Sequence, residues 1–268
     1  MSDTLEKGPC VDCGRVADVP GQAFCPACGQ PTPAHRIDWH FLGHELEHSV
    51  LHMDRGILYS LKNLMLRPGR FIRDYLEGRR ARHVKPFLLI MILAALIVLM
   101  SKYVLGGDLT GAKLLASVAD GAAAKGDQIG AREARMGAAI NEWMSRHFAA
   151  STIMLLPLEA AMFRLAFGRV GRLNYPEWLV VTAFLTAQTF VLWLLTMPLH
   201  AGRTGLAAWV LLPSFAYGVF TLVQLFDGYP RWKTMLRTLV GFGLFMVAGQ
   251  LVTAAVAAGW LLMGGAPP

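Results

Sequence analysis

The sequence predicts an all-α polytopic membrane protein with five transmembrane helices, a small N-terminal zinc ribbon with four cysteine ligands, and an amphipathic interfacial helix. Three observations support this fold class: a high apolar content, several long apolar segments, and four cysteines that all lie within the first 28 residues. Of the 268 residues, 54% are hydrophobic and 16% are charged, against roughly 45–50% and 25% in soluble domains. This composition excludes a disordered, fibrous or disulfide-scaffold protein and disfavours a purely soluble enzyme.

The N-terminal region, residues 1–35, contains two Cys-x-x-Cys-Gly knuckles, in which Gly14 and Gly29 follow the paired cysteines. A tight turn of this kind presents two thiolates to one point and needs a residue that tolerates positive φ. Two knuckles separated by eleven residues can close a tetrahedral site of four sulfurs, which is typical of structural zinc. One zinc ion per chain is therefore predicted, with the ligands Cys10, Cys13, Cys25 and Cys28.

The four thiols have other conceivable uses, namely a disulfide pair, a dithiol redox centre or an iron–sulfur cluster. The predicted topology places them in a reducing compartment, which disfavours structural disulfides. A thioredoxin-like centre has a single Cys-x-x-Cys near a βαβ pattern. About 30 residues bury too little core to fold on burial alone, so metal binding would supply most of the folding free energy. A small cytoplasmic domain of this kind suits the docking of a cytoplasmic protein partner.

Residues 36–85 are predicted to form amphipathic juxtamembrane helices. From Leu42 to Met65 the apolar residues recur at steps of three and four, which indicates a helix with one apolar stripe. We expect Pro68-Gly69 to end this helix, and a second short amphipathic piece to stop at Gly78. The long helix lies in the lipid headgroup region or packs against the protein's own membrane helices, and the sequence leaves both alternatives open.

Basic side chains gather just before the first long apolar segment. Because such clusters attract anionic lipid, we expect lipid contact through Arg67, Arg70, Arg73, Arg79, Arg80, Arg82 and Lys85. The cluster lacks the interleaved aromatic side chains on which the bases of single-stranded nucleic acids stack. We therefore expect no nucleic-acid partner.

Histidines recur every four residues along the predicted helix, at His40, His44, His48 and His52. Within this ridge, His44-Glu45-Leu46-Glu47-His48 matches His-Glu-x-x-His, a pattern that can place two imidazoles on zinc beside a glutamate base. The ridge lies on the polar face of the helix, and the segment leaves no room for a protease domain. A solvated polar face is the leading interpretation, with metal binding by the ridge and a membrane-linked zinc metalloprotease as alternatives.

Residues 86–268 form the predicted membrane domain. Crossing about 30 Å of hydrocarbon takes about 20 apolar residues, and five segments qualify, at about 86–105, 150–167, 178–200, 207–226 and 239–263. Positive residues flank alternate connectors, with Arg169 and Arg172 in one and Arg231 and Lys233 in another. The positive-inside rule then predicts a multi-pass protein of the bacterial cytoplasmic (inner) membrane, with the N-terminus in the cytoplasm and the C-terminus outside. The alanine-rich middle of the 106–149 loop is expected to be helical.

Polar residues inside the spans are few. Glu159 is the one acidic residue well within a predicted span, and Gln188, Gln224 and Gln250 each lie in a different one. Such residues hydrogen-bond between helices or line a functional path. Interhelical bonding is the leading interpretation, and a transporter or channel that uses Glu159 is the alternative.

Several of these residues stand in a familiar order. The stretch Phe24-Cys25-Pro26-x-Cys28-Gly29-Gln30 is followed by Leu66-x-Pro68-Gly69-Arg70-x-Ile72-x-x-Tyr75-Leu76-x-Gly78-x-Arg80 and then by the membrane region. Together they resemble the bacterial DUF3667 family of zinc-ribbon membrane proteins, which has no established activity. The resemblance is densest over residues 10–90 and continues loosely through Asn174-Tyr175-Pro176-Glu177. The topology alone is similar to Yip1-type proteins, which are associated with membrane organisation.

The function favoured by these patterns is that of a non-enzymatic membrane-organising or adaptor protein. Its zinc ribbon would recruit a cytoplasmic partner, and no catalytic residue is expected. The transporter that uses Glu159 and the metalloprotease that uses His44, Glu45 and His48 are the two alternatives from other classes.

Overall fold

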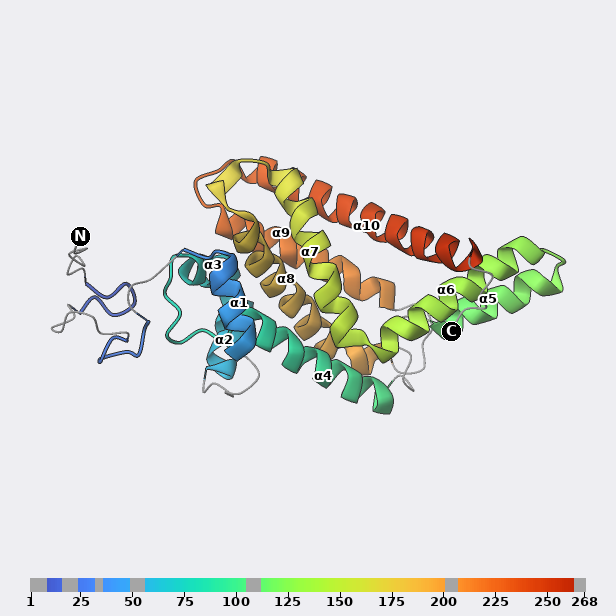
Figure 1. Ribbon diagram of the computed structural model, residues 1–268, viewed down its shortest axis with the longest axis horizontal. Coiled ribbons are helices and arrows are strands. Elements are labelled where there is room, and N and C mark those ends of the chain that lie inside the picture. The colour runs from blue at the N-terminus through green and yellow to red at the C-terminus, as the bar shows by residue number, and fades with distance from the viewer. Residues whose placement is uncertain are drawn as a thin grey trace.

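The computed structural model describes residues 9–15, 24–31, 36–48, 56–104, 112–200 and 207–262. Apart from turns and connectors, these residues are helical, with an isolated antiparallel β-bridge between Phe24 and Pro31. Residues 9–15 and 24–31, here called the four-cysteine head, lie at one end of a helical bundle, and a helical hairpin projects from the other (Figure 1). We refer to these as the head end and the hairpin end of the bundle.

The bundle consists of α4 (Pro86–Val104), α7 (Phe148–Phe167), α8 (Tyr175–Thr196), α9 (Ala207–Leu225) and α10 (Arg231–Leu262). Four stretches are long and apolar enough to cross a membrane: Pro86–Val104, Phe148–Phe167, Tyr175–Leu199 and Arg231–Val256. These four candidate spans coincide with four of the five predicted segments. The fifth coincides with α9, whose described side chains form a shorter apolar helix, Leu211–Leu225, so that span stays a prediction.

Helix α8 forms the centre of the bundle. It packs against α4, α7 and α9, and most of its first half is buried. Trp178 lies among aromatic rings from α7 and from the end of α9, with centroids 5.2 Å from Phe167 and 5.9 Å from Phe226. These rings fix the head-end termini of three helices against one another.

Helix α10 covers one side of the bundle and begins eight residues before the predicted span at 239. The helix therefore includes cationic first turns that lie outside the predicted span. Arg237 is half-buried, and its Nη1 donates hydrogen bonds to the carbonyl oxygens of Ala166 (3.1 Å) and Phe167 (2.6 Å), which end α7. Beyond this contact, large apolar side chains such as Val247 and Leu251 are exposed, as expected of a helix that faces lipid.

Three shorter helices lie at the head end: α1 (Trp39–His48), α2 (Ile57–Leu66) and α3 (Pro68–Leu76). The prediction of one uninterrupted helix over 42–65 is wrong, since Gly56 is in a turn and α2 starts after it. Pro68 does not simply terminate a helix but opens α3, where its missing N–H and fixed φ suit the first position. Helix α3 ends before Gly78, whose φ is +92°, as expected.

Helices α2 and α3 pack against α8 and α9. Leu64, Phe71, Ile72 and Tyr75 are buried there, so in the described residues the apolar stripe faces the bundle. At Gly69 an added Cβ would lie 2.2 Å from Cβ of Gln224. Only glycine permits this approach of α3 to α9.

Polar side chains of the spans complete the backbone hydrogen bonding of this region. Nε2 of Gln188 donates to the carbonyl oxygen of Leu64 (3.2 Å), and the Tyr217 hydroxyl donates to that of Met65. Nη2 of Arg73 donates to the carbonyl oxygens of Gln224 and Leu225, each at 2.7 Å. The last carbonyls of a helix have no partner within it, and here side chains from other helices supply one for α2 and α9.

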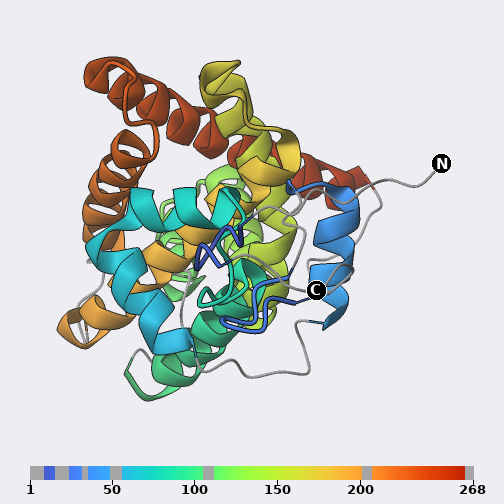
Figure 2. The same ribbon diagram turned by 90° about the vertical axis from the view of Figure 1, so that its left-hand side faces the viewer.

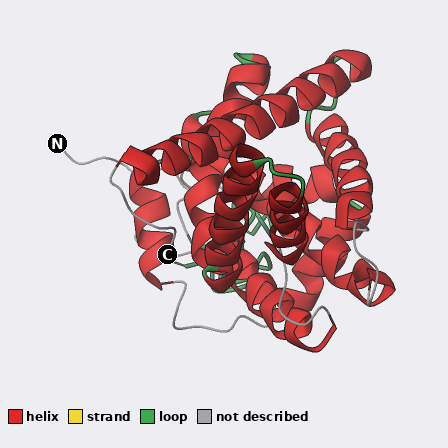
Figure 3. Cartoon of the chain, turned by 90° about the vertical axis from the view of Figure 1, so that its right-hand side faces the viewer, coloured by secondary structure: helices red, strands yellow, loops and turns green. Residues whose placement is uncertain are grey.

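The hairpin end carries α5 (Ala112–Ala124) and α6 (Gln128–Arg146), which pack on each other. The Asp127 carboxylate caps α6 by accepting a hydrogen bond from the Gly130 N–H at 2.9 Å. The helical expectation for the alanine-rich loop is therefore confirmed. Figure 3 looks onto this end and shows helices joined by loops, without a strand among the described residues.

Candidate metal centre and its docking contacts

The four-cysteine head brings the predicted ligand atoms together. The Sγ atoms of Cys10, Cys13, Cys25 and Cys28 all lie within 4.8 Å of one another. The Cys10–Cys28 and Cys13–Cys25 sulfur pairs are 3.7 and 3.6 Å apart. A disulfide requires about 2.05 Å, whereas four sulfurs at about 2.3 Å from a central zinc lie about 3.8 Å apart. The donor set therefore fits a tetrahedral metal ion, and all four cysteines are free thiols.

The two knuckles have the same backbone geometry. Gly14 and Gly29 adopt φ of +72° and +73°, which confirms the expected left-handed positions. Their N–H groups donate to the carbonyl oxygens of Cys10 and Cys25, each at 2.8 Å. The sequence repeat thus produces two equivalent turns that face each other.

The electrostatics of the thiols differ. Hydrogen bonds from the N–H groups of Ala27 and Cys28 lower the pKa of Cys25 to about 7, whereas burial raises the pKa of Cys28 to about 12. A cation among the sulfurs favours ionisation of all four thiols. Metal binding should therefore release protons, and the affinity should fall as the pH is lowered.

Gln30 connects the head to the membrane helices. Its Nε2 donates to the carbonyl oxygen of Gly78 at 2.6 Å, and its Oε1 accepts from the N–H groups of Arg80 and Ala81, each at 2.9 Å. Gln30 is 2% exposed. Its own carbonyl accepts from the Cys25 N–H at 2.8 Å, so the second knuckle positions it directly. We call residues 78–81, between α3 and α4, the elbow.

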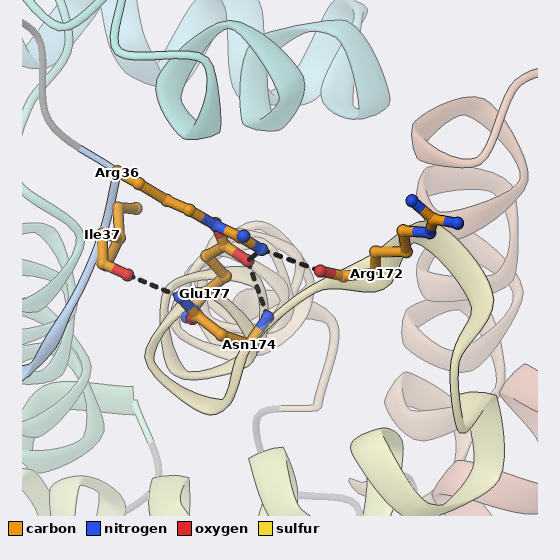
Figure 4. Close-up of polar contacts among 5 residues, drawn as sticks. All are labelled: Arg36, Ile37, Arg172, Asn174 and Glu177. Carbon is orange, nitrogen blue, oxygen red and sulfur yellow. Dashed lines mark hydrogen bonds and ion pairs between the residues drawn. The ribbon is translucent and has the colours of Figure 1, made fainter.

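A second contact joins the following segment to the start of α8 (Figure 4). Arg36 binds both carboxylate oxygens of Glu177, at 2.6 and 2.8 Å, and donates to the Arg172 carbonyl oxygen at 2.7 Å. Glu177 and Asn174 form a capping box at the N-terminus of α8. Nδ2 of Asn174 also donates to the Ile37 carbonyl oxygen at 2.8 Å.

Together these contacts seat the head on one end of the bundle. Figure 2, which looks onto the head end, shows the head in front of the helix ends, with α1 on one side and α2 and α3 on the other. The guanidinium of Arg80 lies 4.2 Å from the ring centroid of Phe41 in α1 and 5.2 Å from that of Tyr75 in α3. The elbow therefore contacts both α1 and α3 as well as the head.

The predicted basic cluster divides into two groups. Arg73, Arg79 and Arg80 bond within the protein, Arg79 with Asp74 at 3.1 Å and with Glu77 at 3.0 Å. Arg67, Arg70 and Arg82 are exposed, and Lys85 is half-buried. The structure thus assigns part of the cluster to internal contacts and leaves the rest at the surface.

The structure describes the two alternative sites, the histidine ridge and Glu159, to different extents. His40 is exposed, but the side chains of His44, Glu45 and His48 and the whole of His52 lie outside the described residues. Glu159 is buried, and its Oε2 accepts a hydrogen bond from Oγ1 of Thr186 at 3.2 Å. This bond links α7 to α8, as the interhelical interpretation expects.

Sequence reasoning missed the roles of Gln30 and Arg36, whose partners lie 48 and 141 residues away. The pattern Asn174-x-x-Glu177 followed by an apolar run was a capping-box signal that could have fixed the start of α8. Nothing in the sequence indicated that Glu177 would bind an arginine from the N-terminal region.

Replacing Glu177 by glutamine should lower the free energy of unfolding by about 1–3 kcal/mol, because hydrogen bonds to a charged group are lost at a buried site. The matched control is Glu142→Gln, since Glu142 pairs with Arg146 at 2.5 Å but is 57% exposed, against 5% for Glu177. Exposed pairs contribute about 0–1 kcal/mol. Denaturant unfolding of detergent-purified protein measures both, and equal losses would contradict the assignment.

Comparison with known proteins gives one match. Residues 54–98 match the family described as "Protein of unknown function (DUF3667)". No curated protein and no solved structure matches the chain, and the looser resemblance to Yip1-type proteins gains no support. The matched segment runs from before α2 through α3 and the elbow into α4. The predicted DUF3667 resemblance is thus confirmed for the segment that joins the head to the membrane helices.

Proposed function

We propose that this chain is a non-enzymatic adaptor protein of the bacterial cytoplasmic membrane, whose zinc-bound head holds a cytoplasmic protein partner near the bilayer. One observation carries the proposal: Gln30 binds the head to the elbow on one side, while Val11 and Phe24 remain 46% and 59% exposed. Aromatic side chains are enriched at the buried cores of protein interfaces, and Phe24 is accessible for such a contact.

The identity of the metal follows from its donors. Four thiolates in tetrahedral geometry favour zinc, and such a closed site has no open position for a substrate. The site therefore supports a structural role. In the proposed mechanism, zinc supplies the crosslink that folds the head, and the residues of the chain position it.

The orientation is inferred from charge. Arg169 and Arg172 lie in the connector after α7, and Arg231 and Lys233 lie in the first turn of α10, all at the head end. By the positive-inside rule this end faces the cytoplasm, where thiols stay reduced. The exposed Arg67, Arg70 and Arg82 at the head end then lie at the level of anionic lipid headgroups.

A purified sample should contain one zinc ion per chain, and the double variant Cys10→Ser/Cys25→Ser should contain none, because each knuckle loses one of its two ligands. Elemental analysis of detergent-purified protein measures the stoichiometry. Cobalt substitution checks the sulfur coordination by its thiolate charge-transfer absorption. Iron or a disulfide in place of zinc would contradict the proposed site, and two zinc ions would revive a site on the histidine ridge.

A photo-reactive residue at position 24 should cross-link in living cells to a cytoplasmic protein. The cross-link should disappear in the Cys10→Ser/Cys25→Ser background, because the unfolded head no longer presents the surface. The matched control position is Ile129, which is apolar and 75% exposed but lies at the hairpin end. An adaptor role fails if position 24 yields only lipid adducts, or the same products as position 129.

A further inference from the structure

A hollow of about 650 Å³ lies at the head end, and none of its lining residues belongs to the four-cysteine head. Its walls are the last residue of α7 with the connector that follows, the connector after α9, and one residue of α10. The first connector follows α7, which is long and apolar enough to cross a membrane, the second follows the apolar helix α9, and both lie at the same end of the bundle (Figure 1). The hollow is therefore placed where the spans leave the hydrocarbon, at the depth of lipid headgroups.

Charged side chains of both signs line the hollow: Arg169, Asp227 and Arg237. Arg169 and Asp227 are exposed and, within the described parts of the chain, make no ion pair or side-chain hydrogen bond. Arg237 is held in place, because its Nη1 donates to two carbonyl oxygens of α7 and its guanidinium lies 5.8 Å from the ring centroid of Tyr229. A guanidinium carries five N–H donors. Only Nη1 of Arg237 donates to the α7 carbonyl oxygens, so the other nitrogen atoms retain N–H donors for a ligand.

The rest of the lining is largely apolar and tightly built. The rings of Phe167 and Phe226 stack with centroids 5.0 Å apart. Gly171 has φ of +71°, and an added Cβ would lie 2.4 Å from the Phe226 ring. The two connectors thus hold each other in one arrangement, with the charged side chains around an aromatic floor.

We propose that this hollow binds a phosphoethanolamine headgroup, supplied by phosphatidylethanolamine of the surrounding membrane. Arg169 and Arg237 bind the phosphate through charge-assisted hydrogen bonds, as guanidinium groups do with phosphate. Asp227, from the other connector, accepts hydrogen bonds from the ammonium group. The half-buried Tyr229 is the lining aromatic side chain that contacts the glycerol region of the lipid.

The charge pattern distinguishes this headgroup from others. A headgroup with phosphate and no amine would leave Asp227 beside a negative charge, which is repulsive at short range. A choline headgroup carries a quaternary ammonium that has no N–H to donate to Asp227. Soluble phosphoethanolamine offers the same charged groups but has no acyl chains to contact the apolar membrane surface.

Native mass spectrometry of the full chain in detergent, titrated separately with phosphatidylethanolamine, phosphatidylglycerol and phosphatidylcholine, tests the site. The wild-type protein should bind phosphatidylethanolamine most tightly. Arg169→Gln should weaken that binding roughly tenfold, as expected for a lost charged hydrogen bond. Asp227→Asn should remove the preference for phosphatidylethanolamine over phosphatidylglycerol.

Two controls make the result decisive. Arg231→Gln removes an exposed arginine at the same end that does not line the hollow, and it should leave the titrations unchanged. Equal binding of the three lipids, or equal losses in Arg169→Gln and Arg231→Gln, would overturn the site. Soluble phosphoethanolamine that binds as tightly as the lipid would overturn the membrane source. None of these outcomes depends on the four-cysteine head, so they are independent of the proposed adaptor role.

Discussion

The arrangement of the molecule depends on the three hydrogen bonds between Gln30 and the elbow. An amide side chain that is both donor and acceptor satisfies a carbonyl and two N–H groups of a turn that is otherwise irregular. Buried polar groups left without partners cost about 1–3 kcal/mol each. The head therefore completes the backbone bonding of the elbow, and the elbow in turn fixes the position of the head. A head that was only tethered would leave these groups unpaired.

The same requirement governs the junctions within the bundle. Backbone N–H and C=O groups that are buried away from water need hydrogen-bond partners. The break between α2 and α3 meets this condition through Gln188 and Tyr217, and the ends of α9 and α7 meet it through Arg73 and Arg237. Arg73 of the predicted basic cluster and Gln188 of a predicted span thus bond to the carbonyl oxygens at helix ends.

How far the sequence determines these features depends on the range of the interaction. The knuckles were predictable because each Cys-x-x-Cys-Gly turn fixes its geometry locally. The four long apolar helices were predictable because segment length and hydropathy are sufficient to recognise them. The side chains that cap helices from a distance were not predictable, since Arg237 donates to the carbonyl oxygen of a residue 70 positions away. Pro68 was predicted to end a helix, whereas it also begins α3, because proline suits the first position of a helix as well as the position after its end. The hollow between the connectors has no sequence signature, since its residues come from three separate elements.

The DUF3667 match covers the segment through which the head, the elbow and the first span are coupled. Within it, Gly69 permits the contact with α9, and Gly78 and Arg80 take part in the bonds to Gln30 and to the end of α3. These residues act by positioning other elements, and none of them presents a reactive group to a cleft. In this structure they connect the four-cysteine head, α3 and α9.

Hydrogen exchange at the backbone amides of Arg80 and Ala81, measured on the full chain before and after metal chelation, tests the coupling of head and elbow most directly. If the metal positions Gln30, these two amides should be protected in the metal-bound protein. Chelation should then release them to fast exchange while the amides of α8 stay protected. Protection of Arg80 and Ala81 that persists after the metal has been removed would contradict the account.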